Sequence, residues 1–274
     1  KSYVSPMGDL VDMFGDGSSA SRTESTSRYY QLTATNTAEY IFDINKKHMF
    51  TVLLGQEAII SKSEGFSAYR AGLSDPDLTL ITNATEDPVV SQSVVETVFN
   101  SFFGEASYNY SDKYFFSASL RRDGSSKFSK DNRWSTFWSI GGRWNMMKEN
   151  FMENFKPWLN QLDFKASYGT TGNSSIGDYA YFGLVSGQGV QYNGENGLIL
   201  SQSSVKDLTW ETVAQANVGF EARVFDRFTL GFEYYHKKTS DMLLSIPYSY
   251  TTGFLSGAGN IGAMVNKGID INVD

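Results

Sequence analysis

Aromatic and amide side chains gather in one glycine-rich stretch of the chain. Tyr179, Tyr181, Tyr192 and Asn193 all lie in this stretch. Aromatic rings stack on the apolar faces of sugars and peptides, and amides supply directed hydrogen bonds. We therefore take these four residues as candidate ligand contacts. The alternative is that they only pack their own loop together.

Acidic side chains form a second candidate site. Asp75, Asp77, Glu86 and Asp87 lie in one long polar connection, where their carboxylates could bind calcium or could simply be solvated. The chain has 2 His and no Cys, and neither histidine has the spacing of a zinc ligand set. We predict no cofactor and keep a loop-bound calcium ion as the one alternative.

The sequence carries no arrangement typical of an enzyme. Gly257, Gly259 and Gly262 spell GxGxxG, but a dinucleotide site also needs a preceding strand, a following helix and an acidic residue about 20 positions later. The serine-rich runs at 18–27 and 201–204 have no GxSxG elbow. A net charge of -7 and a pI near 5.0 argue against a nucleic-acid partner. We expect no catalysis.

The composition indicates a surface that largely avoids water. Of 274 residues, 15% are aromatic and only 19% are charged, whereas about a quarter of the residues in soluble domains are charged. Mean hydropathy is nevertheless -0.32, and no run approaches the roughly 18 apolar residues of a spanning helix. The remaining structure that crosses a bilayer is a closed β-barrel, whose strands alternate apolar and polar residues.

Strand alternation recurs along most of the chain. From Tyr30 to Ile44 the even positions are mostly apolar and the odd positions mostly polar. The same period recurs around residues 49–55, 101–110, 114–121, 134–144, 162–168, 210–221 and 228–237. We therefore expect eight antiparallel strands and a ninth that begins near Gly268. The first spans roughly 50 Å and should project beyond the membrane.

The connections alternate in length. Tight turns are expected at 45–47, 111–113 and 225–227, and long loops near 61–93, 123–133, 171–208 and 239–267, with a further loop over 1–26. Short periplasmic turns and long extracellular loops are typical of outer-membrane barrels, so we place the loops 61–93, 171–208 and 239–267 outside the cell. The connection 145–161 is too long for the turn side, and Met147, Phe151 and Phe155 at helical spacing predict a short helix there.

Aromatic residues concentrate at the predicted strand ends. They are Tyr108, Tyr110, Tyr114, Trp134, Trp138, Trp144, Tyr234 and Tyr235. Such positions correspond to the aromatic belts of a barrel at the lipid headgroups. A soluble carbohydrate-binding β-sandwich shares the alternation but would bury these rings centrally, so the barrel is favoured.

A series of motifs runs in order from about Tyr29 onward. They are FGEASYNYSDKYFFSASLRRDGSSKF at 103–128, FKASYGTTGN at 164–173, DLTWE at 207–211, NVGF at 217–220, YYHKKTSDML at 234–243 and NIGAMVNKG at 260–268. Together they resemble the SusC/RagA family of TonB-dependent outer-membrane transporters.

The resemblance implies an all-β fold, a transmembrane antiparallel β-barrel. Residues 1–274 would form a partial barrel domain with about 8–9 of roughly 22 strands and no plug domain. It also implies an outer-membrane importer of oligosaccharides or oligopeptides in a Gram-negative, Bacteroidetes-like bacterium. Its partners would be a SusD-like surface lipoprotein, and TonB with ExbB and ExbD acting through the missing plug. The sequence leaves the cargo open, and a passive or structural outer-membrane barrel is the alternative function.

Overall fold

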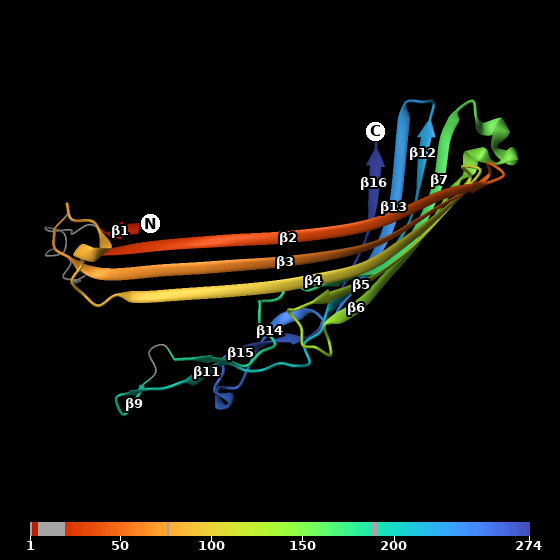
Figure 1. Ribbon diagram of the computed structural model, residues 1–274. Coiled ribbons are helices and arrows are strands. Elements are labelled where there is room, and N and C mark those ends of the chain that lie inside the picture. Colours follow the sequence, from red (N-terminus) through yellow and green to blue (C-terminus); the bar gives the residue numbers. More distant parts are fainter. Residues whose placement is uncertain (1, 5–19, 76, 188–190) are drawn as a thin grey trace. The chain divides into compact units, whose positions relative to one another are not determined.

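The protein is dominated by one long sheet in a computed structural model that describes residues 2–4, 20–75, 77–187 and 191–274 (Figure 1). Ten strands are hydrogen-bonded in the order β1-β2-β3-β4-β5-β6-β7-β12-β13-β16. They are β1 (Ser2–Val4), β2 (Ala20–Ile44), β3 (His48–Leu73), β4 (Val89–Tyr110), β5 (Tyr114–Ser125), β6 (Trp134–Asn145), β7 (Leu159–Asn173), β12 (Glu211–Val224), β13 (Phe228–Ser240) and β16 (Ala263–Val273). Because sequence neighbours are also sheet neighbours, the sheet is an up-and-down meander.

Shorter elements lie in the connections. Three two-stranded pairs join β8 (Leu184–Ser186) to β11 (Ile199–Gln202), β9 (Gln191–Tyr192) to β10 (Glu195–Asn196), and β14 (Leu243–Pro247) to β15 (Ser256–Asn260). The 3-10 helices are η1 (Ile81–Asn83), η2 (Met146–Lys148), η3 (Asn150–Phe155) and η4 (Tyr250–Thr252). Among the described residues, no helix is long and apolar enough to cross a membrane.

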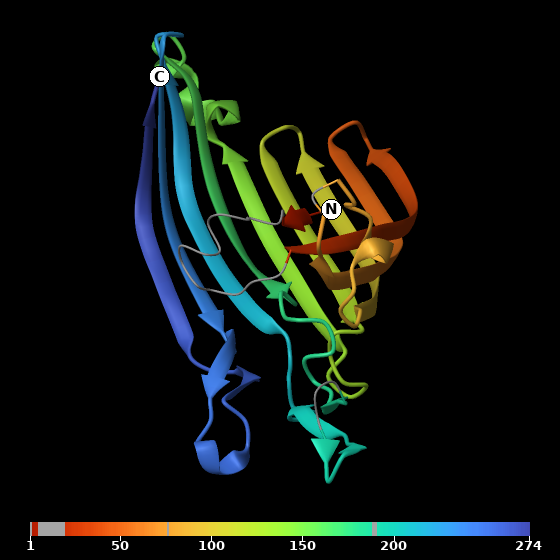
Figure 2. The same ribbon diagram turned by 90° about the vertical axis from the view of Figure 1, so that its left-hand side faces the viewer.

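The chain divides into two compact units. One comprises Lys1–Leu32 with Ile60–Thr97, and the other comprises Thr33–Ile59 with Val98–Asp274. The first contains the parts of β2, β3 and β4 that are farthest from their tight turns, and its small core is Ala20, Leu73 and Ala84. The second contains β5–β7, β12, β13 and β16, which lie side by side with short turns at one end and long connections at the other (Figure 2).

The eight predicted strands and the ninth are confirmed, but several loop bounds are wrong. The predicted loop 61–93 is mostly strand, since β3 runs to Leu73 and β4 begins at Val89. The serine-rich ends of these strands pair with their neighbours, but apolar and polar residues do not alternate there. The periodicity of the sequence therefore did not identify them as strand. Of the other three predicted long loops, 123–133 shortens to 126–133, 171–208 moves to 174–210 and 239–267 shortens to 241–262.

Two further loop predictions also need correction. Within the predicted loop 1–26, β2 already begins at Ala20, and residues 5–19 lie outside the described residues. The predicted helix near 145–161 is present as the two short 3-10 helices η2 and η3. Their buried residues are Met147 and Met152, whereas Phe151 and Phe155 are exposed. Of the three residues at helical spacing only Met147 is therefore buried, because a 3-10 helix repeats every three residues rather than every 3.6.

The three predicted tight turns share one conformation. In each, two consecutive non-glycine residues have positive φ, between 51° and 55°. They are Asn45 and Lys46, Ser111 and Asp112, and Phe225 and Asp226. A backbone hydrogen bond closes each turn at 2.9 to 3.3 Å. Two positive φ values in succession define the type I′ turn, whose twist matches the twist of paired strands.

Alternation and register divide the second unit into two faces. Val218 lies opposite Ala166 and Tyr234 and is 58% exposed. The other large exposed apolar side chains on this face include Phe116, Leu120, Ile140, Tyr168, Ile269 and Ile271. Since the wall of a membrane barrel is apolar towards lipid and polar towards the lumen, we call this the outward face and the opposite one the inward face.

An aromatic row crosses the outward face near the short turns. Neighbouring strands contribute rings directly opposite one another, with ring centroids 5.7 to 6.3 Å apart. The row consists of Tyr110, Tyr114, Trp144, Phe164, Phe220 and Phe232. Its place is that of a belt at the lipid headgroups. Tyr235, which the sequence also assigned to a belt, instead faces inward, because it pairs with Asn217 and Gly268.

Candidate functional site

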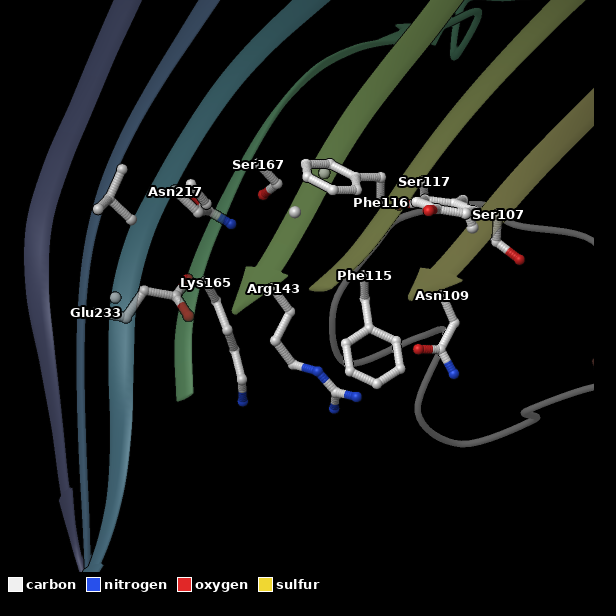
Figure 3. A pocket seen from close by; sticks show the side chains of 16 residues that line it. Ser107, Asn109, Phe115, Phe116, Ser117, Arg143, Lys165, Ser167, Asn217 and Glu233 are labelled. Carbon is white, nitrogen blue, oxygen red and sulfur yellow. The ribbon is translucent and has the colours of Figure 1, made fainter. Parts of the chain in front are cut away.

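The inward face carries a polar row that could line a passage. Register aligns one residue from each of seven neighbouring strands. The row consists of Asn109, Phe115, Arg143, Lys165, Gly219, Glu233 and Asp270. An open hollow of about 400 Å³ runs beside it and is also lined by Ser107, Ser117, Ser167 and Asn217 (Figure 3). This part of the inward face therefore presents hydroxyl, amide and charged groups beside the Phe115 ring.

Charged residues of this face are held by neighbours on adjacent strands. The Arg143 guanidinium lies over the Phe115 ring at 3.9 Å from its centroid, a cation–π contact. Lys165 Nζ lies 2.7 Å from a Glu221 carboxylate oxygen, and Gln161 Nε2 donates to the other at 3.1 Å. These contacts fix the directions of the charges, so the wall offers a patterned rather than a uniform potential.

A compact apolar cluster closes the other end of the second unit, where the long connections begin. Phe128, Phe137, Leu208 and Trp210 are buried together. The Trp210 ring lies 5.2 Å from the Phe128 ring and 5.7 Å from the Phe137 ring, and its Nε1 donates to the Arg133 carbonyl at 3.0 Å. We call this group the loop-base cluster, because it packs the 126–133 loop against the end of the 174–210 connection.

Polar side chains link the end of the 174–210 connection to the 241–262 connection. Asn260 accepts a hydrogen bond from the Thr209 amide at 2.8 Å, and its Nδ2 donates to the carbonyls of Thr209 and Asp241. Glu211 accepts from the Leu243 amide at 3.1 Å with one oxygen and from an Asn173 amide group with the other. The motifs DLTWE and NIGAMVNKG therefore tie the loop bases to each other.

The four predicted ligand residues fall into two separate groups. Tyr181 is half-buried against the loop-base cluster, and its ring lies 4.2 Å from that of Phe182. Tyr179 has a positive φ of 61°, and its carbonyl accepts a hydrogen bond from Gln202. Both therefore have structural partners at the loop base, as the packing alternative required.

Tyr192 and Asn193 lie at the tip of the β9–β10 hairpin. Tyr192 is 85% exposed, whereas Asn193 and Gly194 have φ of 51° and 83° and form the turn itself. An Asn-Gly pair is the preferred sequence for such a turn. Tyr192 is thus the candidate most available to a ligand, and ligand contact by all four residues stays a prediction.

The acidic candidates show a local turn and no cluster. Asp75 Oδ1 accepts a hydrogen bond from the Asp77 amide at 2.8 Å. Across the described ranges, no three His, Asp or Glu side chains are grouped so as to hold a metal ion. The absence of a cofactor stays a prediction of the sequence, with loop-bound calcium as its alternative. The GxGxxG glycines lie in and just after β15, with Gly262 at a positive φ of 79°, which is a hairpin rather than a strand–helix unit.

On the short-turn side, one carboxylate accepts hydrogen bonds from three side chains. Glu149, between η2 and η3, accepts from Lys113 Nζ at 2.8 Å, from the Tyr114 hydroxyl at 2.6 Å and from Trp144 Nε1 at 3.2 Å. The hydrogen bond from Lys113 holds the pKa of the Glu149 carboxyl below its usual value. The same bond raises the pKa of Lys113 above its usual value. Sequence reasoning missed this group, since its members are brought together only by the strand register.

Comparison with known proteins identifies the family of this chain. Residues 2–274 match the family described as TonB dependent receptor-like, beta-barrel. The chain belongs to this family. It is 34% identical over 268 residues to TonB-dependent receptor P26 of Formosa agariphila, which covers 95% of this chain and 27% of the relative. It is also 34% identical over 182 residues to TonB-dependent receptor SusC of Bacteroides thetaiotaomicron, with 64% of this chain and 18% of that protein covered.

A solved structure gives the same result. The RagAB peptide importer in its closed-closed state superposes with a TM-score of 0.87 at 34% identity, over 93% of this chain and 28% of that chain. The SusC/RagA resemblance and the all-β barrel fold are confirmed. This barrel segment spans about a quarter of the length of P26 and of the RagAB chain.

Proposed function

We propose that this chain forms part of the wall of an outer-membrane importer that takes oligosaccharides or oligopeptides into a Gram-negative bacterium. The match to RagAB carries the proposal, because it combines 34% identity with a TM-score of 0.87, so sequence and backbone agree. That structure is described as a peptide importer, which favours oligopeptides as the cargo to test first. No reaction is assigned to the chain.

The two faces of the wall suit this role. Outward apolar residues can face lipid, while the inward face offers hydroxyls, amides and both signs of charge. Such a surface can hold water and a polar polymer without binding either tightly, as a passage requires. Packing and hydrogen bonds hold the bases of the long connections together, so the hairpin tips are the parts that can contact the cargo or a surface partner.

The partners follow from the family. In the proposed importer, a SusD-like surface lipoprotein covers the side with the long connections, and TonB with ExbB and ExbD supplies energy through a plug domain. The alternative is a passive barrel that admits small solutes without TonB. Both proposals place the chain in the outer membrane.

Uptake by cells that produce the intact protein tests the function. Fluorescent oligopeptides and oligosaccharides are offered to wild-type cells, to a deletion strain and to wild-type cells treated with a protonophore. Importer function predicts that uptake is lost in the deletion strain and in the cells treated with the protonophore. Uptake that persists with the protonophore but not in the deletion strain would support the passive barrel, and uptake unchanged by the deletion would refute both functions.

The ligand residues are tested in the same assay with a matched pair of variants. Tyr192→Ala removes the exposed ring at the β9–β10 tip, and Tyr250→Ala removes a ring that is equally 85% exposed but lies in η4 of another connection. If Tyr192 contacts cargo, only Tyr192→Ala raises the concentration needed for half-maximal uptake. Equal effects of the two variants would remove Tyr192 from the site.

A further inference from the structure

The connection between β6 and β7 departs from the short turns around it. Residues 146–158 form η2, η3 and a short tail at the end of the sheet where the other hairpins turn in two residues (Figure 1). An extra segment at this end is not needed to join two antiparallel strands, because a two-residue turn suffices. We call these residues the rim segment and ask what they contact.

The rim segment packs on the outward face of the wall. Its buried side chains Met147 and Met152 form a cluster with Ala222, and Leu162 and Phe220 pack against that cluster. Ala222 belongs to the same face of β12 as Val218, since the two are four residues apart on one strand. Val218 is 58% exposed whereas Ala222 is 8% exposed. The rim segment therefore covers the apolar surface just beyond the aromatic row.

Hydrogen bonds attach the rim segment to the aromatic row itself. Tyr114 and Trp144 both belong to that row, and both donate to Glu149 of the rim segment. Lys113 in the preceding turn forms an ion pair with the same carboxylate at 2.8 Å. The segment is thus held at the level of the headgroup belt and on the lipid side of the wall.

The surface that the rim segment turns away from the wall is aromatic. Phe151, Phe155 and Trp158 are 57%, 43% and 41% exposed, and Phe225 in the adjoining turn is 61% exposed. The rings of Phe155 and Trp158 lie 6.1 Å apart, and those of Trp158 and Phe225 lie 6.5 Å apart. Three neighbouring large rings on the surface, with Phe151 exposed on the same segment, are unfavourable in water and need an apolar environment.

We propose that the rim segment, together with Phe225, is a membrane anchor that seats these rings in the phospholipid leaflet on the short-turn side. Lipid is the fitting partner, because the rim segment that carries these rings packs on the outward face and is hydrogen-bonded to the aromatic row. Aromatic rings prefer the boundary between headgroups and acyl chains. The proposal is independent of the cargo and of TonB.

Site-directed spin labelling tests the anchor. The chain has no Cys, so Phe151→Cys and Phe155→Cys each give one labelling site in this chain. Glu153→Cys is the matched control, since this charged residue lies between them on η3 and its side chain is 71% exposed. Each nitroxide-labelled intact protein is reconstituted in vesicles of phosphatidylethanolamine and phosphatidylglycerol, and its collisions with oxygen and with a water-soluble nickel chelate are measured.

The anchor predicts that labels at 151 and 155 collide mainly with oxygen, while the label at 153 collides mainly with nickel. Nickel access at all three positions would overturn the proposal and show that the rings face water, where a soluble protein could bind them. Low collision rates with both reagents at 151 and 155 would overturn it as well, because they would indicate that protein covers the surface.

A second measurement does not depend on labelling. Brominated acyl chains quench nearby indoles, so the wild-type protein in brominated vesicles should lose more fluorescence than its Trp158→Phe variant. The phenyl ring keeps the apolar contact, which makes unfolding of this variant a minor concern. Equal quenching of the two proteins would contradict the anchor even if the cysteine variants failed to fold.

Discussion

Gly172 leaves no room for a single methyl group. A Cβ at this position would lie 2.0 Å from Cζ of Phe137, whereas carbon atoms in contact are normally about 3.5–4 Å apart. The Phe137 ring is only 5% exposed and packs against Trp210 in the loop-base cluster. In Gly172→Ala the ring must therefore move into a region that is already filled.

Two opposing effects set the size of the change. Overpacking a filled core costs about 1–3 kcal/mol, while alanine is favoured over glycine in a strand by roughly 0.5–1 kcal/mol. We expect Gly172→Ala to lower the free energy of unfolding by about 1–2 kcal/mol. Gly177→Ala is the matched control, because a Cβ there meets no atom within 4 Å.

Urea unfolding of the intact protein in phospholipid vesicles measures this difference. Proteolysis of the 174–210 connection should report the same perturbation locally, because the loop-base cluster holds the end of that connection. Phe137→Leu shortens the obstructing ring, so Gly172→Ala should cost less in the Phe137→Leu background, with a coupling energy of about 0.5–3 kcal/mol. Equal midpoints for Gly172→Ala and Gly177→Ala, or strict additivity in the double variant, would refute the steric reasoning.

Three further outcomes are expected. Asn260→Ala leaves backbone groups of two connections unpaired and should cost about 1–3 kcal/mol, seen as faster hydrogen exchange at the base of the 174–210 connection but not in β5. Because the folded-state pKa of Glu149 is lowered, the stability that Glu149 contributes is present near neutral pH and is lost as pH falls through that pKa. The urea midpoints of wild type and Glu149→Gln should therefore converge in acid. The pKa of its partner Lys113 is raised, so the stability that Lys113 contributes should be lost only as pH rises through the folded-state pKa of Lys113. Lys165→Met breaks a largely exposed pair with Glu221 and should change stability by no more than about 1 kcal/mol, with a larger loss in urea midpoint contradicting this assignment.

The sequence predicted the strands well because both physical signals of a barrel strand are local. Alternation identified the strands, and short connections identified the tight turns at 45–47, 111–113 and 225–227, which the structure shows to be type I′. The serine-rich ends of β3 and β4 escaped detection because apolar and polar residues do not alternate there.

The candidate site could be predicted only in part, because its positions depend on register. Arg143, Lys165 and Glu233 are widely separated in the sequence and become one row through pairing. The sequence selected Tyr181 for its residue type, yet burial against Leu208 and its neighbours decides its packing role. Likewise the spacing of Met147, Phe151 and Phe155 predicted a helix, but in the 3-10 helices that form only Met147 of these three is buried, together with Met152.

The junction at Asn260 bears on how such a protein can evolve. Its side chain bonds to backbone groups of Thr209 and Asp241, and backbone groups are the same whatever side chains the neighbouring loops carry. Residues of the hairpin tips can therefore be exchanged without altering the junction that supports them. In the proposed importer, the tips could therefore change in sequence, and with them what the loops bind, while folding depends on a separate set of positions.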